Sequence, residues 1–407
     1  MKIAFRSCAS VSATLLACLL PLGSLGCSSS DDADDTAPAK VVANYAALVD
    51  ANYADALAQA KKLDAALHTF TEAPSEETLA AARKAWISAR VPYGLSEAYR
   101  FAQGPIDNDD QDDDVPDGPE GRINSWPLDE SYIDYVVGPN AEVISGGIIN
   151  SPDEFPTIDA EALAAANANP KVGETSISTG YHAIEFLLWG QDLSEDGPGD
   201  RPYTDYVSGE EGTAENQDRR AQYLLTVSQL LVDDLSQVSA AWADGEANYR
   251  ADFLAMPSKE ALSKMLLGMG SLAGAELSGE RMQVAYDNKD QEDEHSCFSD
   301  NTLADLHGNA TSVQDVLLGR YGDLDGPGID DLVADKAPEL AEKLRTQLQG
   351  AIDEIEAVPA PFDQAILGDD DTEGRQHLRA AIDHLKAFTE TLTDAAKSLD
   401  IDLKFDE

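Results

Sequence analysis

The chain has 407 residues, of which 28 are Lys or Arg and 76 are Asp or Glu, so its formal net charge is −48 at pH 7. Phosphate binding needs clustered basic side chains, and this balance therefore argues against nucleic acid and anionic lipid surfaces as partners. An apolar fraction of 43% is ample for a buried core, which argues against a disordered chain.

The first 26 residues have the pattern of a lipoprotein signal peptide. Lys2 and Arg6 precede an apolar run at residues 11–20, and the segment ends at Cys27. We expect Cys27 to be lipidated, which would anchor an extracytoplasmic protein to the cell envelope, facing the periplasm or the cell surface. An ordinary signal peptidase site is the alternative, because the residues before Cys27 depart from the lipoprotein pattern at one position. Residues 27–39 are rich in Ser, Asp and Ala and predict a flexible acidic tether.

From about residue 40, apolar residues recur at spacings of three and four, the period of an amphipathic helix. Ser75 is placed to cap the second helix and Pro92 to kink it. Strand-like alternation is scarce, so we predict an all-α protein of helical bundles with long polar loops. The expected helices lie at about 40–70, 75–101, 174–190, 214–243, 258–287, 300–320, 328–357 and 373–399.

Two segments of the chain resemble each other. PSEETLAAARKAW…LSEAYRF, from Pro74, aligns without gaps with PSKEALSKMLLGM…LSGERMQV, from Pro257. We therefore predict two related helical-bundle halves, residues 40–250 and 251–407, packed together with a cleft between them.

The stretch TGYHAIEFLLWGQD places a His and a Glu three residues apart in an apolar run. In a helix His182 and Glu185 project from the same face, one turn apart. An imidazole and a carboxylate at this spacing can ligate one metal ion, as Glu-x-x-His pairs do in bundle metal sites. A buried hydrogen bond between the two side chains, without a metal, is the alternative.

The same stretch resembles the G-x-H-x-x-E signature of the imelysin-like family, with Gly180, His182 and Glu185 at the signature positions. AWISARVPYGLSEAYRF, INSWPLDESYIDY, LWGQDLSEDGPGDRPYTDY and GERMQVAYDNKDQEDEHSCFSDNT look like further blocks of its iron-regulated protein A-like branch. The resemblance covers most of the chain from about residue 40. It implies an extracytoplasmic protein of two helical bundles, with a site in the cleft, from a family that was named for metallopeptidases and occurs in bacterial iron uptake.

Further metal ligands must come from other segments. Glu97 is the first candidate, because it follows Arg90 and Tyr93 on one helical stripe, and Asp129 is the second. Arg90 and Tyr93 are candidate contacts to a bound ligand, since an arginine keeps its proton and is not itself a metal ligand. The second half offers three more candidates: Glu276, Glu280 and His295. Oxygen-rich sites with an imidazole suit iron better than soft metals.

The segment DNDDQDDDVPDGPEG, residues 107–121, places Asp at alternating positions among Gly and Pro. It resembles calcium-loop chemistry, in which carboxylates and carbonyls supply the oxygens. The candidate ligands are Asp107, Asp109, Asp112 and Asp114. The segment lacks the Gly and terminal Glu of an EF-hand, and a solvated acidic loop is the alternative.

Together these features predict a lipid-anchored envelope protein that binds iron or a related cation in the cleft and serves iron acquisition with an envelope iron-uptake or redox partner. A metallopeptidase using His182 and Glu185 is one alternative. The H-E-x-x-H zinc pattern is absent, however, and a zinc hydrolase needs about three protein ligands and a base. A module that binds an organic ligand or a protein, without a metal, is the other alternative.

Overall fold

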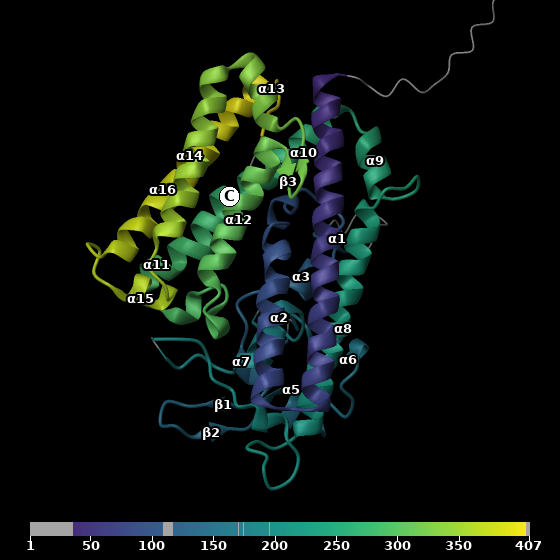
Figure 1. Ribbon diagram of the computed structural model, residues 1–407, viewed down its shortest axis with the longest axis vertical. Helices are drawn as coiled ribbons and strands as arrows, with labels where there is room; N and C mark the ends of the chain where they lie inside the picture. Colours follow the sequence, from purple (N-terminus) through teal and green to yellow (C-terminus); the bar gives the residue numbers. More distant parts are fainter. Residues whose placement is uncertain (1–35, 109–116, 170, 174, 195, 404–407) are drawn as a thin grey trace, which may run out of the picture. The chain divides into compact units, whose positions relative to one another are not determined.

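The computed structural model describes residues 36–108, 117–169, 171–173, 175–194 and 196–403 (Figure 1). The expected signal peptide, Cys27 and three of the candidate calcium ligands lie outside the described residues; these three are Asp109, Asp112 and Asp114. The first helix begins at Ala37 with Thr36 as its N-cap, so the predicted tether extends three residues too far. Residues from Thr36 onward form one compact unit, and the division into halves at residue 250 stays a prediction.

The described chain is helical with two small hairpins, which confirms the predicted all-α class. The longer helices are α1 (Ala37–Glu72), α2 (Glu76–Gly94), α7 (Gly180–Trp189), α8 (Gln217–Trp242), α10 (Ser258–Ser271), α12 (Thr302–Leu318), α14 (Pro338–Ala357) and α16 (Glu373–Ser398). The shorter helices are α3 (Glu120–Ile123), α4 (Glu130–Ile133), α5 (Gly147–Asn150), α6 (Ala160–Ala166), α9 (Tyr249–Ala255), α11 (Val284–Asn288), α13 (Ile329–Lys336) and α15 (Phe362–Leu367). No described helix is long and apolar enough to cross a membrane.

Several irregular elements join these helices. The 3-10 turns are η1 (Glu97–Tyr99), η2 (Tyr203–Tyr206), η4 (Gln291–Asp293) and η5 (Cys297–Ser299). A π-helix, η3 (Leu272–Gln283), continues α10 into α11. The antiparallel hairpins pair β1 (Val136–Val137) with β2 (Val143–Ile144), and β3 (Arg320–Tyr321) with β4 (Leu324–Asp325). The two hairpins have two residues per strand, so helix packing forms the core.

In the first group of helices, α1 packs against α2 and α8, and α7 packs against both α2 and α8 (Figure 1). Apolar residues that recur every seven positions explain the straight, buried face of α1. They are Val42, Val49, Ala56, Leu63 and Phe70, all buried. Residues spaced by one heptad share a helix face, so this stripe joins α1 to its two neighbours along its whole length.

In the second group, α16 packs against α14 and η3, and α12 packs against α14 (Figure 1). The buried face of α16 carries Leu378, Ile382, Leu385 and Leu392 at helical spacing. Helix α12 also contacts α2, so it connects the two groups. Side chains from α2, α7 and α12 can therefore meet in the interior.

Candidate functional site

Helix α7, which carries the His–Glu pair, is buried at all ten of its residues. It starts at Gly180, which has φ +86°, a conformation that L side chains rarely adopt. A Cβ atom there would lie 2.5 Å from the carbonyl oxygen of Ile123 in α3. The glycine thus lets the first turn of α7 press against α3, and this contact fixes the direction in which His182 points.

The predicted pair does form a contact. The Nδ1 atom of His182 lies 2.9 Å from Oε2 of Glu185, and both side chains are fully buried. The other oxygen of Glu185, Oε1, accepts hydrogen bonds from the backbone N–H (3.0 Å) and the hydroxyl (2.6 Å) of Ser299. Both oxygens of Glu185 are therefore engaged. In this geometry Glu185 holds the ring of His182, and its role as an inner metal ligand stays a prediction.

The second nitrogen of His182, Nε2, is buried and has no hydrogen-bond partner among the described residues. Burial and the neighbouring His295 lower the pKa of His182 well below its ordinary value. Burial also raises the pKa of Glu185 to about 8. The imidazole is consequently neutral at pH 7, the state in which histidine binds metals.

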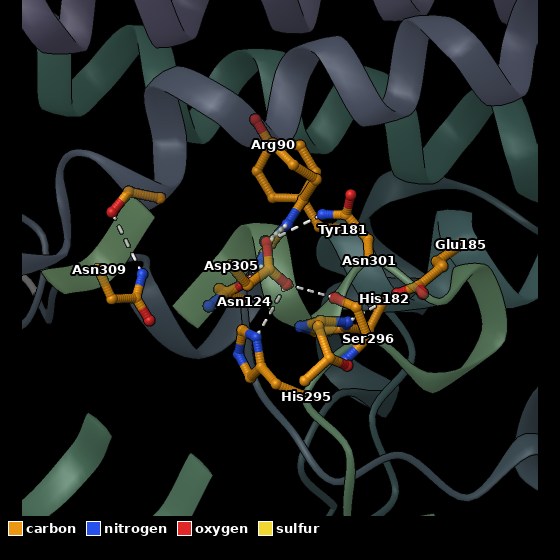
Figure 2. A network of polar contacts seen from close by, with 12 residues as sticks. Arg90, Asn124, Tyr181, His182, Glu185, His295, Ser296, Asn301, Asp305 and Asn309 are labelled. Atoms are coloured by element: carbon orange, nitrogen blue, oxygen red, sulfur yellow. Dashed lines mark hydrogen bonds and ion pairs between the residues drawn. The ribbon is translucent and has the colours of Figure 1, made fainter. Parts of the chain in front are cut away.

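A second histidine lies beside the first. The ring of His295 is 4.9 Å from that of His182, and Trp126 packs on His182 at the same centroid distance. The Nδ1 atom of His295 lies 3.1 Å from Oδ2 of Asp305, so each imidazole is held by a carboxylate through Nδ1 (Figure 2). Burial lowers the pKa of His295 to about 4, and this ring is neutral as well.

Asp305, in the first turn of α12, accepts hydrogen bonds from four side chains (Figure 2). Arg90 donates from Nε (3.3 Å) and Nη2 (3.0 Å), and Asn301 donates from Nδ2 (3.1 Å). The hydroxyl of Ser296 and the ring of His295 are the other two. Burial opposes ionisation, but the Arg90 guanidinium and these hydrogen bonds hold the pKa of Asp305 well below its usual range.

Arg90 extends from α2 to this carboxylate, and three aromatic rings surround its guanidinium group. Its guanidinium carbon lies 5.7 Å from the ring centroid of Trp86, 5.5 Å from Tyr93 and 5.1 Å from Tyr181. Its remaining Nη1 donates to the amide oxygen of Asn124. Arg90 and Tyr93, predicted as ligand contacts, are thus parts of the buried scaffold, where ring faces favour the cation.

Glu97, the first candidate for a further ligand, is the counter-ion of two arginines. Its Oε2 accepts from Nη1 of Arg100 and from Nη2 of Arg281, each at 2.9 Å. Burial opposes ionisation, but these guanidinium groups lower the pKa of Glu97 to about 2. Its Oε1 has no partner in the described part of the chain, and it therefore stays a candidate ligand. Glu276 forms an ion pair with Arg281 at 2.9 Å.

The histidines lie beside a cleft between segments from both predicted halves. A cavity of about 330 Å³ is bounded by Trp126 and Arg100 on one side and by Glu280, Arg281 and His295 on the other. His295 lines this cavity, and His182 lies behind it, fully buried. A larger cavity of about 920 Å³ also includes Arg100, so the cleft continues away from the histidines.

Two further predicted ligands, Asp129 and Asp107, are engaged by neighbouring residues of the chain. Asp129 is exposed and caps α4, where its Oδ1 accepts from the backbone N–H (3.0 Å) and hydroxyl (2.6 Å) of Ser131. Asp107, predicted as a calcium ligand, accepts from the backbone N–H groups of Gly104 (3.1 Å) and Phe101. Both carboxylates thus have local structural partners.

Sequence reasoning missed several residues of the site, above all Asp305. The others are Asn124, Ser296, Ser299 and Asn301. One signal was available, because Asp305, Asn309 and Ser312 recur at spacings of four and three along α12. All three are buried, and they form a polar stripe on an otherwise apolar face. Such a stripe indicates an internal hydrogen-bond network.

Fold and site together define an all-helical protein with two adjacent histidines, each held by a carboxylate, at the edge of a cleft. The sequence profile of the imelysin family matches residues 49–392, and the chain belongs to this family. The resemblance drawn from the G-x-H-x-x-E stretch is thereby confirmed.

The chain is similar to two proteins that carry the name iron-regulated protein A and to a further imelysin-like protein. Iron-regulated protein A of Synechococcus elongatus is 24% identical over 313 residues, which cover 77% of this chain and 73% of that protein. A crystal structure described as that of an iron-regulated protein A precursor from Parabacteroides distasonis has a TM-score of 0.65 and 20% identity, covering 89% of this chain and 95% of that one. An imelysin-like protein from Psychrobacter arcticum has a TM-score of 0.62 and 16% identity, covering 92% and 99%. These two structures show the shared fold.

Proposed function

We propose that the protein binds iron, or a related cation, as cargo at His182 and His295, and serves iron acquisition at the cell envelope. The observation that carries this proposal is the Nε2 atom of His182, which is fully buried and has no hydrogen-bond partner among the described residues. Leaving a buried polar atom without a partner costs roughly 1–3 kcal/mol, so such an atom indicates a missing ligand.

The surroundings of the two histidines support a metal rather than an additional hydrogen bond. In metal centres a ligating imidazole commonly donates its other N–H to a carboxylate, which fixes the ring and its tautomer. Asp305 is placed to do this for His295, and Glu185 does it for His182 once its carboxyl group, whose pKa burial raises to about 8, is ionised. Both rings are neutral at pH 7, so neither needs to lose a proton before an ion binds.

Two imidazoles do not complete the coordination of iron. The remaining positions are supplied by water, or by ligands that the ion carries into the cavity of about 330 Å³ beside His295. Glu97 is the candidate for a third protein ligand, through its unpartnered Oε1. Imidazole and oxygen donors suit iron, and the relatives that carry the name iron-regulated protein A support this choice. Envelope anchoring rests on the sequence pattern at Cys27.

The test measures binding of the ion to chelator-treated, desalted protein. Ferrous iron is titrated anaerobically by calorimetry, with elemental analysis of the desalted complex. We expect His182→Ala to weaken iron binding at least tenfold. Glu185→Gln should weaken it about 10–100-fold, because the carboxyl group that holds the His182 ring is lost. His307→Ala is the matched control, because the side chain of His307 is 40% exposed and pairs with Glu356 of α14 at 3.0 Å. Equal affinity of the wild type and His182→Ala would refute the proposal.

A further inference from the structure

We infer a second cation site, suited to a hard divalent ion such as Ca²⁺, formed by Asp192, Asp300 and Asp363. Each acid comes from a different segment. Asp192 follows the C-cap of α7, Asp300 is the C-cap of η5, and Asp363 lies in α15. One carboxylate oxygen of each lies within 4.8 Å of the others. Since Ca²⁺ binds oxygen at about 2.3–2.6 Å, two oxygens on one ion lie at most about 5 Å apart.

Glu294 is a separate observation that points to an ion at this place. Its side chain is fully buried, and neither carboxylate oxygen accepts a hydrogen bond of good geometry from the described residues. Its nearest polar neighbours are Asp363 and Thr302, and Asp300 acts on it through its charge, so its carboxyl group faces the cluster. Oδ2 of Asp363 and Oδ1 of Asp300 are also buried without a partner. A buried carboxylate requires a partner, and here three acids share the same deficit.

The cluster has no protein cation to balance it. The four acids of the cluster and its neighbour are Asp192, Glu294, Asp300 and Asp363. In the described segments of the chain, none of them forms an ion pair with Lys, Arg or His. The arginines of the neighbouring network are held by other acids, as Arg90 is by Asp305. Like charges at this separation repel strongly in a poorly solvated setting, and a bound divalent ion removes that repulsion.

The chemistry of the donors selects the ion. All four groups offer oxygen, and none offers nitrogen or sulfur, which favours a hard cation over zinc or copper. Ca²⁺ accepts six to eight oxygens in flexible geometry, whereas Mg²⁺ requires a near-ideal octahedron at about 2.0–2.1 Å. Buried and partly buried carboxylates, with water in the remaining positions, fit Ca²⁺ better.

The test uses the purified protein, treated with EDTA and desalted, with CaCl₂ as the probe. In thermal unfolding we expect Tm to rise by about 3 °C at a hundredfold excess of Ca²⁺ over its dissociation constant. Calorimetry should show one site, and MgCl₂ should give a smaller shift. Asp300→Asn and Asp363→Asn should each weaken Ca²⁺ binding at least tenfold. Asp371→Asn removes the same charge from an exposed residue and should leave binding unchanged.

Two further measurements separate the outcomes. Without Ca²⁺, Asp300→Asn should be at least as stable as the wild type, because it relieves repulsion, and an unchanged circular dichroism spectrum verifies its fold. His182→Ala should keep the full Ca²⁺ response, so failure of the iron proposal is distinguishable from failure of this one. An unchanged Tm of the wild type in Ca²⁺ would overturn the inference. Ca²⁺ responses of Asp300→Asn and Asp363→Asn equal to that of the wild type would overturn it as well. The carboxyl groups would then hold one another through shared protons.

Discussion

The ion pair between Arg90 and Asp305 is the centre of the buried network, and its removal provides the sharpest test of the site's architecture. Both side chains are 2% exposed and are joined by two hydrogen bonds. Asp305→Asn keeps the size of the side chain but removes its charge. Arg90 then remains buried as a cation without a counter-ion, while His295 loses the carboxylate that holds its ring.

The expected cost follows from the burial of the pair. Removing one partner of a buried ion pair destabilises a protein by about 3–5 kcal/mol, because the other charge is left uncompensated. Entropy of unfolding is about 2.1 cal/mol/K per residue, so roughly 370 folded residues lose about 1 °C for each 0.8 kcal/mol. Asp305→Asn should therefore lower Tm by about 4–6 °C. Arg90→Met should cost a similar amount, since it also removes the contacts with Trp86, Tyr93 and Tyr181.

The assay is a double-mutant cycle measured by urea denaturation in the presence of a chelator, so that no metal contributes. The double variant should be less destabilised than the sum of the single variants by at least about 2 kcal/mol, because no lone charge remains. Asp353→Asn, in an exposed acid that accepts from Gln349, should change stability by less than about 0.5 kcal/mol. Additive single effects, or a loss under about 1 kcal/mol in Asp305→Asn, would refute this account of the network.

Two other predictions concern the scaffold around the site. Asp134 is bound by Arg201 (2.8 Å) and Arg220 (2.6 Å), and although burial opposes ionisation, these arginines lower its pKa to about 2. Because its unfolded pKa is about 3.9, it contributes about 2–3 kcal/mol above pH 4, which is lost as the pH falls towards 2. When the free energy of unfolding is measured by urea denaturation between pH 2 and 7, Asp134→Asn should not show this loss of stability. In the same assay at pH 7, Gly180→Ala should destabilise the protein by at least about 2 kcal/mol, because φ is +86° there and a carbonyl oxygen lies 2.5 Å from the new Cβ. Gly197→Ala is the control: nothing lies within 4 Å of its new Cβ, so its stability should be nearly unchanged.

Local patterns in the sequence were sufficient to predict the helices and one histidine. The heptad stripe of α1, from Val42 to Phe70, forms the buried face that its period predicts. The spacing of His182 and Glu185 likewise predicted their contact, because residues three apart share a helix face whatever the rest of the fold does. Ser75 caps α2 as expected.

The long-range pairings could not be predicted in the same way. His295, just before η5, meets His182 because η5 packs against α7, and no local period records that contact. The sequence also indicated which face Glu185 occupies, but not that Ser299 engages its second oxygen. An acid that shares a face with a histidine can ligate a metal or hold the ligand in place, and only the remaining hydrogen bonds decide between these roles.

The buried polar groups without hydrogen-bond partners belong to two neighbouring sites with different ligand chemistry. The sites lie on either side of Ser299 and Asp300. Ser299 donates twice to Glu185, which holds His182, and the next residue, Asp300, belongs to the acidic cluster. The neutral imidazole is suited to a borderline metal, and the cluster to a hard one. An ion bound at the cluster would fix the position of Asp300 and thereby the two hydrogen-bond donors of Ser299. The orientation of the His182 ring is therefore expected to depend on the occupancy of the second site, because Asp300 directly follows Ser299 in the chain.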